Sequence, residues 1–382
     1  PYRRDRLAFK RMDGKRLEFP DESFDFVWSC SSIEHFGGHT GAEMAAYQKA
    51  AWWGAQSGNP RLLVGWNVFA SARQAHLTDL EANVTWPYFD TYNFHHYEPF
   101  DRYPELYRRH RAVSAGRPIW VTECAWPVRW SGDARLQEPS EEDLRVQAER
   151  VVKTFAAALH EGASAVFYFL LPHYVEGQTQ FGLLRPDLTP RPGYVALAAV
   201  GRWFAEARAV GRARVDERGL RLFVFEARPE GRRRDVVVVW SEAGVQRLGL
   251  AMEPVEVRDH LGRPVHGSRD LKIGRAPLIL VLRAGQGRAL VEETAPPAPV
   301  WRPGRPSPLV LQAIWPEERI DLAQSAYRVD ANGPVEIPVR LYHFGERPIR
   351  GRFEVQAPSG WHARFVEQIR MDPGECRDER LQ

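Results

Sequence analysis

Glu123 is the residue whose type and position most directly suggest chemistry. It ends the short apolar run at residues 118–123 (PIWVTE), and a run of this kind is typical of a buried parallel strand. Parallel strands deliver their last residues to one open edge of a sheet, where a carboxylate can attack an electrophile or exchange a proton. The alternative is an ion pair with one of the many arginines of the chain.

Two side chains on the preceding strand-like run could act on Glu123. The run at residues 89–97 (FDTYNFHHY) ends with His95 and Tyr97, which a parallel arrangement brings to the same edge. The Tyr97 hydroxyl could donate a hydrogen bond that keeps Glu123 ionised, and His95 could orient that pair or contact a substrate hydroxyl. A core tyrosine and a hydrogen-bonded core histidine are the alternatives.

Composition is that of a globular protein and argues against several classes of function. Of the 382 residues, 44% are apolar and 26% are charged, and the formal net charge is +3. The arginines are scattered, which argues against nucleic-acid binding. The cysteines, Cys30, Cys124 and Cys376, lie far apart in the sequence without metal-ligand spacing, so neither a disulfide framework nor a zinc site is indicated. No apolar run is long enough to span a bilayer. Because the chain starts at Pro1, we expect the native N-terminus to lie upstream, and neither export nor oligomeric state is predicted.

The segment around these residues alternates helix-like and strand-like stretches. Helices are predicted at residues 42–55, 72–81, 104–114, 140–162 and 192–205, with Ser140 and Asp143 as a capping pair for the fourth. Strands are predicted at residues 62–69, 89–97, 119–123 and 165–171. This alternation predicts a parallel α/β unit, and its four strands are half of an eight-stranded barrel.

Period-two runs replace this alternation after about residue 210. Strands predicted at residues 220–226, 235–240, 255–259 and 277–282 indicate an antiparallel β-sandwich. The Pro-rich stretch at residues 296–308 predicts a semi-rigid linker. Later alternating runs at residues 335–343 and 352–356 resemble the start of an immunoglobulin-like domain that is truncated at Gln382.

Four stretches of the α/β segment resemble the second half of the clan A glycoside hydrolases, which are retaining (β/α)8-barrel enzymes. Residues 89–97 are similar to the sixth strand of that clan, residues 120–123 to the seventh, which ends on the nucleophile, and residues 162–169 to the eighth. Residues 181–194 (FGLLRPDLTPRPGY) resemble the approach to the last helix. The resemblance implies α/β structure followed by all-β structure: strands 5–8 of a TIM barrel at residues 46–206, a β-sandwich at 207–292, a linker at 293–310 and a truncated immunoglobulin-like domain at 311–382.

The resemblance also implies a reaction. A retaining hydrolysis of β-linked glycosides would use Glu123 as the nucleophile and a carbohydrate as the substrate, with no cofactor and no metal. His95 and Tyr97 would then line the substrate site. Tryptophans that follow strand ends could stack on sugar rings, with core packing as the alternative. The further candidates for substrate binding are Trp66, Trp126, Trp130 and His173.

The start of the chain departs from this pattern. In the clan, the acid/base carboxylate follows an Asn at the end of the fourth strand, and this chain contains no Asn-Glu pair. Residues 11–37 (RMDGKRLEFPDESFDFVWSCSSIEHFG) resemble instead the middle of a class I methyltransferase dependent on S-adenosylmethionine, in which the residue matching Asp13 contacts the adenosine. The Gly-rich loop of that family would lie upstream of Pro1, and one strand cannot build a Rossmann-type site.

Two explanations of this start are open. Residues 1–45 can be a methyltransferase-like fragment joined to half a glycosidase, which would make the chain a chimera. Residues 24–31 can instead replace the lost fourth barrel strand, with Glu34 as a speculative acid/base. The alternative functions are therefore a methyltransferase remnant, or a non-catalytic carbohydrate-binding module in which only the β domains act.

Overall fold

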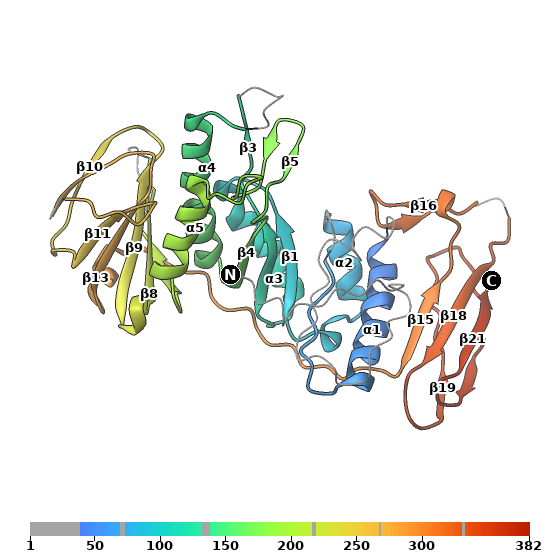
Figure 1. Cartoon of the computed structure of the whole chain (residues 1–382). Coiled ribbons are helices and arrows are strands. Elements are labelled where there is room, and N and C mark those ends of the chain that lie inside the picture. Colours follow the sequence, from blue (N-terminus) through green and yellow to red (C-terminus); the bar gives the residue numbers. More distant parts are fainter. Residues whose placement is uncertain (1–38, 69–72, 132–137, 216–218, 267–268, 331–332) are drawn as a thin grey trace, which may run out of the picture.

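The chain folds into an α/β unit with a β unit on one side and a group of small antiparallel sheets on the other (Figure 1). The computed structural model describes residues 39–68, 73–131, 138–215, 219–266, 269–330 and 333–382. The order of mixed α/β structure followed by all-β structure agrees with the sequence prediction. Asp13 and Glu34 lie outside the described residues.

A three-stranded parallel sheet lies at the centre of the α/β unit. Its strands β1 (Tyr92–His96), β2 (Ile119–Cys124) and β4 (Ala163–Tyr168) pair in the order β1-β2-β4. Side chains alternate between the faces of a strand, so Tyr92, Phe94 and Val121 are buried in the core that the sheet shares with its helices. Those helices are α1 (Gly41–Gly58), α2 (Gln74–Ala82), α3 (Tyr103–Ser114), α4 (Glu141–His160) and α5 (Pro192–Trp203).

Side-chain caps fix where the two longest helices begin. Ser140 Oγ accepts a hydrogen bond from Asp143 N, and Ser140 N donates one to the Asp143 carboxylate, which confirms the predicted capping pair of α4. Thr40 and Glu43 form the same reciprocal arrangement at the start of α1. The caps satisfy backbone N–H groups that have no partner within the helix.

The structure corrects the prediction of a fourth strand at residues 62–69. Among the described residues of this segment, Gly65 forms a single parallel bridge to Thr91, and Trp66 N donates to Thr91 O at 2.8 Å. A Cβ at position 65 would lie 2.3 Å from Asn93 Nδ2, so the Asn93 side chain would have to move to admit any residue larger than glycine. A glycine also weakens a strand because it adds no side chain to the packing. The described part of the sheet therefore has three strands, and residues 64–66 contact it beside the start of β1 without forming a fourth.

The β unit is built on a six-stranded sheet that is buried on both faces. Its order is β11 (Glu256–Asp259), β13 (Leu278–Arg283), β9 (Arg234–Ser241), β8 (Leu220–Ala227), β7 (Arg208–Arg212) and β14 (Glu293–Thr294). Val236 and Val238 join the core of the α/β unit, whereas Val237 and Val239 face a second core. The small sheet of β10 (Gln246–Gly249) and β12 (Asp270–Ile273) contributes Leu271 and Ile273 to that core. Strands β7, β10, β12 and β14 are additions to those predicted.

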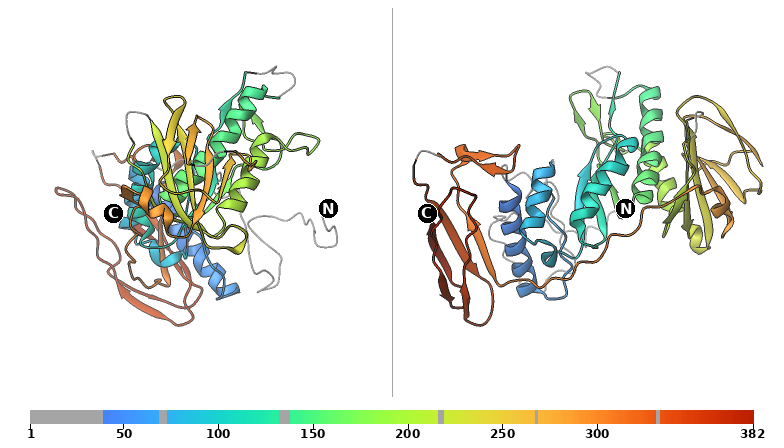
Figure 2. Two further views of the ribbon diagram at one scale, coloured as in Figure 1. Left: turned by 90° about the vertical axis from the view of Figure 1, so that its left-hand side faces the viewer. Right: turned by 180° about the vertical axis from the view of Figure 1, so that it is seen from behind.

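The last residues form three antiparallel sheets beside α1 (Figure 2). The largest pairs β15 (Leu309–Ala313), β18 (Ile337–His343) and β21 (Cys376–Leu381). The others pair β16 (Ile320–Asp321) with β17 (Ala326–Tyr327), and β19 (Ile349–Arg352) with β20 (Gln368–Met371). Contacts reach α1 from this group, because the Tyr327 hydroxyl lies 2.7 Å from Thr40 Oγ1 and Gly41 N donates to Ser325 Oγ at 2.7 Å.

The Pro-rich segment between the β unit and these sheets runs back along the α/β unit (Figure 2). Arg302 N donates to Ala115 O at 3.0 Å, and Trp86 Nε1 donates to Pro303 O at 3.0 Å. The Arg117 guanidinium lies 4.0 Å from the centre of the Trp301 ring. The segment predicted as a linker is therefore anchored on the α/β unit, and it carries the chain from one side of that unit to the other.

Four buried histidines make the fold sensitive to acid. Burial lowers the pKa of His96 and His110 to about 3, and of His160 and His260 to about 4. A folded pKa below the unfolded value of about 6.5 adds stability that is complete above that pH and is lost as the pH falls toward the folded pKa. We expect the urea midpoint of unfolding to fall steeply from about pH 7.5 to about pH 5, each histidine contributing at most about 1.4 kcal/mol per pH unit below 6.5.

The control for this acid effect is a histidine outside the core. His266 is exposed, so His266→Gln should leave the pH dependence of the midpoint unchanged. A urea midpoint that is constant between these two pH values in the unsubstituted chain would contradict the expectation. The buried imidazoles would then be protonated as readily in the folded state as in the unfolded state.

Candidate active site

Glu123, Tyr97 and His95 meet at the carboxyl ends of β1 and β2. The register between the strands shifts between Phe94 and His95, which places His95 opposite Glu123. His95 Nδ1 lies 3.8 Å from Glu123 Oε2, and the two side chains are 11% and 12% exposed. The Tyr97 hydroxyl donates a hydrogen bond to Glu123 Oε1. The structure thus contains the hydrogen bond and the neighbour that the sequence predicts, and the catalytic roles stay predictions.

The surroundings keep Tyr97 as a proton donor. Burial, followed by the hydrogen bond to Glu123 and the charge of that carboxylate, raises the pKa of Tyr97 well above its usual value. The phenol therefore keeps its proton at every pH below about 10. Burial and then the charge of Glu123 also raise the pKa of the Cys124 thiol. Cys124 is therefore a neutral core residue at this strand end.

A second carboxylate, Glu176, lies close to this group. It ends the short strand β5 (Val175–Glu176), which pairs with β6 (Thr179–Gln180), and β6 pairs with β3 (Val128–Arg129). The Tyr174 hydroxyl donates to Glu176 Oε1 at 2.6 Å. The sequence prediction missed Glu176, because a lone Glu in a loop next to Gly177 shows neither strand pattern nor motif.

Four aromatic rings connect the two carboxylates. The Tyr97 ring centroid lies 6.2 Å from that of Phe169 and 5.9 Å from that of Phe181. The Tyr174 ring contacts the same two phenylalanines, at 5.6 Å and 6.0 Å. The hydrogen bond to Glu176 comes first among the causes that raise the pKa of Tyr174, and the charge of Glu123 is a smaller one. Each tyrosine therefore donates a hydrogen bond to one of the two carboxylates, and the charge of the other carboxylate also raises its pKa.

The loop that carries Glu176 is held by a buried arginine. The Arg191 side chain is fully buried, and its Nη2 donates to Glu138 Oε2 at 2.6 Å. The same nitrogen lies 3.1 Å from His173 Nδ1, and Nη1 donates to Gly182 O at 3.2 Å. Burial and then the charge of Arg191 lower the pKa of His173, which keeps its imidazole a neutral acceptor. His173 thus contacts Arg191, a partner that the sequence did not predict.

The structure corrects the expectation for two of the three tryptophans. Trp66 is 1% exposed and Trp130 is 2% exposed, so protein atoms cover both indole rings. Trp126 packs between Phe100, at 5.6 Å, and the Arg150 guanidinium, at 4.4 Å. Trp120 was not predicted. It pairs in register with Asn93, on the sheet face that also carries His95, and its ring lies 6.1 Å from the ring of Phe167, which is 39% exposed.

The described residues were also searched for metal-binding clusters and for membrane-spanning helices. Among them, no group of three or more His, Cys, Asp or Glu side chains is placed to hold a metal ion. Within the same ranges, no helix is both long enough and apolar enough to cross a membrane.

Comparison with known proteins gives two separate similarities. A family model described as "Methyltransferase domain" matches residues 2–49, the segment whose sequence resembles a methyltransferase. The match extends into α1, which begins at Gly41. No curated protein matches the chain.

Several of the solved structures that the chain resembles are glycoside hydrolases. A family 39 glycoside hydrolase from the gut symbiont Bacteroides cellulosilyticus is 16% identical, with a TM-score of 0.47, over 63% of this chain and 55% of that chain. A family 30 subfamily 8 xylanase from Clostridium acetobutylicum is 14% identical, with a TM-score of 0.43, over 64% and 61% of the two chains. A family 51 α-L-arabinofuranosidase from Thermotoga petrophila is 11% identical, with a TM-score of 0.42, over 64% and 62%. The chain thus spans 55% to 62% of the length of these structures.

Proposed function

We propose that the chain is a glycoside hydrolase-like protein whose site performs retaining hydrolysis of O-glycosidic bonds, with Glu123 as the nucleophile. The observation that carries the proposal is the hydrogen bond from Tyr97 to Glu123 beside His95. Under this proposal, β1, β2 and β4 with the bridge at Gly65 belong to half of a (β/α)8 barrel. The units at residues 1–45, 46–206, 207–292, 293–310 and 311–382 are proposed on the same basis.

The proposed reaction assigns one task to each side chain. Glu123 attacks the anomeric carbon, and a second carboxylic acid protonates the departing glycosidic oxygen. The same acid then removes a proton from the water that releases the glycosyl group from Glu123. A donated hydrogen bond stabilises an ionised carboxylate, so Tyr97 keeps Glu123 ready to attack. His95 is proposed to contact a sugar hydroxyl.

The second carboxylate has two candidates in this chain. Glu34 is the candidate from the sequence, and it lies outside the described residues. Glu176 is the candidate from the structure, because the Tyr174 and Tyr97 rings contact the same two phenylalanines. Glu176 is exposed and receives a hydrogen bond from Tyr174. We propose Glu176 as the acid/base. Because its side chain is exposed, its carboxyl group can leave the Tyr174 hydroxyl, turn toward a bound glycoside and take up the proton that the acid step requires.

A mechanism-based probe tests the nucleophile. A 2-deoxy-2-fluoro glycoside with a good leaving group forms its covalent intermediate faster than water releases it, so mass spectrometry should find the added sugar on the peptide that contains Glu123. A chain that binds oligosaccharides but acquires no such mass would contradict the proposal. Sugar binding that survives Glu123→Gln would then favour the non-catalytic carbohydrate-binding module.

One observation favours a second function. The match of residues 2–49 to a methyltransferase family model supports a methyltransferase remnant at the start of the chain. The matched segment is too short for the nucleotide crevice that such a fold places between its strands. Calorimetric titration with S-adenosylmethionine tests this function: measurable binding would support it, and the absence of heat would leave the glycoside hydrolase proposal alone.

A further inference from the structure

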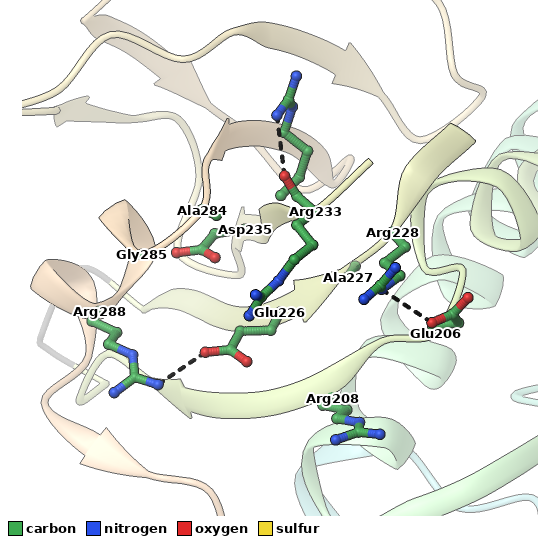
Figure 3. Close-up of a pocket in the computed structure, with 11 residues that line it drawn as sticks. Glu206, Arg208, Glu226, Ala227, Arg228, Arg233, Asp235, Ala284, Gly285 and Arg288 are labelled. Carbon is green, nitrogen blue, oxygen red and sulfur yellow. Dashed lines mark hydrogen bonds and ion pairs between the residues drawn. The ribbon is translucent and has the colours of Figure 1, made fainter. Parts of the chain in front are cut away.

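The β unit contains a pocket that is lined by five arginines and three carboxylates (Figure 3). We call it the arginine pocket. Its cavity of about 480 Å³ falls within the range of small-ligand sites. It lies at the ends of β7, β8, β9 and β13, and it contains none of the residues around Glu123. The arginine pocket is therefore a separate site from the residues around Glu123.

Three charged residues form a row across the sheet at this end. Arg208 on β7 lies opposite Glu226 on β8, and Glu226 lies opposite Asp235 on β9. Residues directly opposite on neighbouring strands project from the same face. Two adjacent carboxylates repel each other, so Glu226 and Asp235 need positive charge or hydrogen-bond donors nearby.

Two ion pairs lie at opposite sides of the pocket, and one of them provides positive charge for Glu226 (Figure 3). Arg288 Nη2 donates to Glu226 Oε1 at 2.9 Å, and Arg228 Nε lies 3.3 Å from Glu206 Oε2. The described residues provide no acidic partner for Arg208 or Arg233. These guanidinium groups are therefore available to an anion from outside, and their planar forks suit a carboxylate.

Asp235 supplies a second, independent sign of a missing ligand. The residue is 1% exposed, and Gly287 N donates to its Oδ2 at 2.7 Å. Only a glycine permits this contact, because a Cβ at position 287 would lie 2.7 Å from Val224 Cγ1. Oδ1 is buried and has no hydrogen-bond partner among the described residues. A buried carboxylate oxygen without a donor is costly, so a bound hydroxyl group would stabilise this side chain.

We propose that the arginine pocket binds an acidic saccharide. Arg208 and Arg233 hold the carboxylate of a uronic acid residue, and sugar hydroxyl groups donate to Asp235 and Glu226. A sugar acid separates its negative group from its hydroxyl groups by several bonds, which matches a pocket that offers guanidinium groups and carboxylates side by side. A small inorganic anion has no donors for Asp235, and its charge is repelled by both carboxylates.

Calorimetric titration of the full chain with digalacturonate tests the proposal. Cellobiose serves as the neutral disaccharide and sodium sulfate as the simple anion. Digalacturonate should bind, cellobiose should not, and Arg208→Gln and Arg233→Gln should each weaken digalacturonate binding by about tenfold. Arg247→Gln is the matched control, because Arg247 is exposed on β10 of the same unit, pairs with Asp270 and lies outside the pocket.

The other results contradict the proposal. An absence of digalacturonate binding, equal binding of cellobiose, or complete displacement by equimolar sulfate would exclude an acidic-saccharide site. An equal loss in Arg247→Gln would show a general effect of charge. Asp235→Asn tests the hydroxyl contact. This variant should bind digalacturonate more weakly than the unsubstituted chain does, and it should bind sulfate as the unsubstituted chain does. If it does not fold, the arginine variants still decide. Glu123→Gln should bind digalacturonate unchanged, which separates failure here from failure of the proposed catalytic site.

Discussion

Replacement of Glu123 by Gln is expected to lower kcat/KM for a dinitrophenyl β-glycoside by on the order of 10³-fold or more. The glutamine side chain has nearly the same shape and can still accept the hydrogen bond from Tyr97. Its amide is not a nucleophile, so the bond between the sugar and residue 123 cannot form. Initial rates of dinitrophenol release, measured with the unsubstituted and substituted chains at equal concentration, check this expectation.

The matched control is Glu98, which follows Tyr97 in the chain. It is exposed and accepts a hydrogen bond from Tyr97 N at 3.0 Å, so it neighbours the same tyrosine without reaching the proposed nucleophile. Glu98→Gln should retain kcat/KM within about threefold, as expected for a surface substitution. If the two variants lost activity equally, or if Glu123→Gln retained it, Glu123 would be a structural residue of the strand end.

Glu123 and Tyr97 could be placed from sequence because strand ends are visible in a one-dimensional pattern. An apolar run that stops on a polar residue indicates both the strand and the edge where it ends. The pairing of Tyr97 with Glu123 follows from two parallel neighbours. The same reasoning found the Ser140 cap, because capping depends on residues three positions apart.

Tertiary contacts determine the features that the sequence did not show. The run at residues 62–69 has strand composition, but its described residues form one isolated bridge, at Gly65, and a few hydrogen bonds to residues 90–91 instead of a ladder. Trp66 lies within that run and was expected to face a substrate, yet its ring packs at 5.9 Å against Phe89 in the core. Glu176 approaches Glu123 only because Phe169 and Phe181 hold Tyr174 near Tyr97. Contacts between residues distant in the chain leave no periodic signal in the sequence.

Replacement of Glu176 by Ala is expected to lower kcat for glycosides with poor leaving groups by roughly 10²- to 10⁴-fold, the usual contribution of a general acid or base. A dinitrophenyl glycoside needs no protonation of its leaving group, so its first step should be spared and its second step, attack by water, should become limiting. Azide needs no base to attack the glycosyl group on Glu123. Added azide should therefore restore turnover of the dinitrophenyl substrate and yield a glycosyl azide of retained configuration.

The same experiment separates the two proposed acid/base residues. Glu34→Ala should show no rescue by azide if Glu176 has this role, and the opposite pattern would assign it to Glu34. Asp187→Asn is the control on the loop of Glu176, since Asp187 is exposed and accepts only local hydrogen bonds from Thr189. A general acid or base determines part of the pH profile of the rate, so removal of Glu176 should also alter that profile if it has this role. A Glu176→Ala chain with an unchanged rate and an unchanged profile would leave Glu123 without a partner on this loop, and hydrolysis would then need a carboxylate from elsewhere.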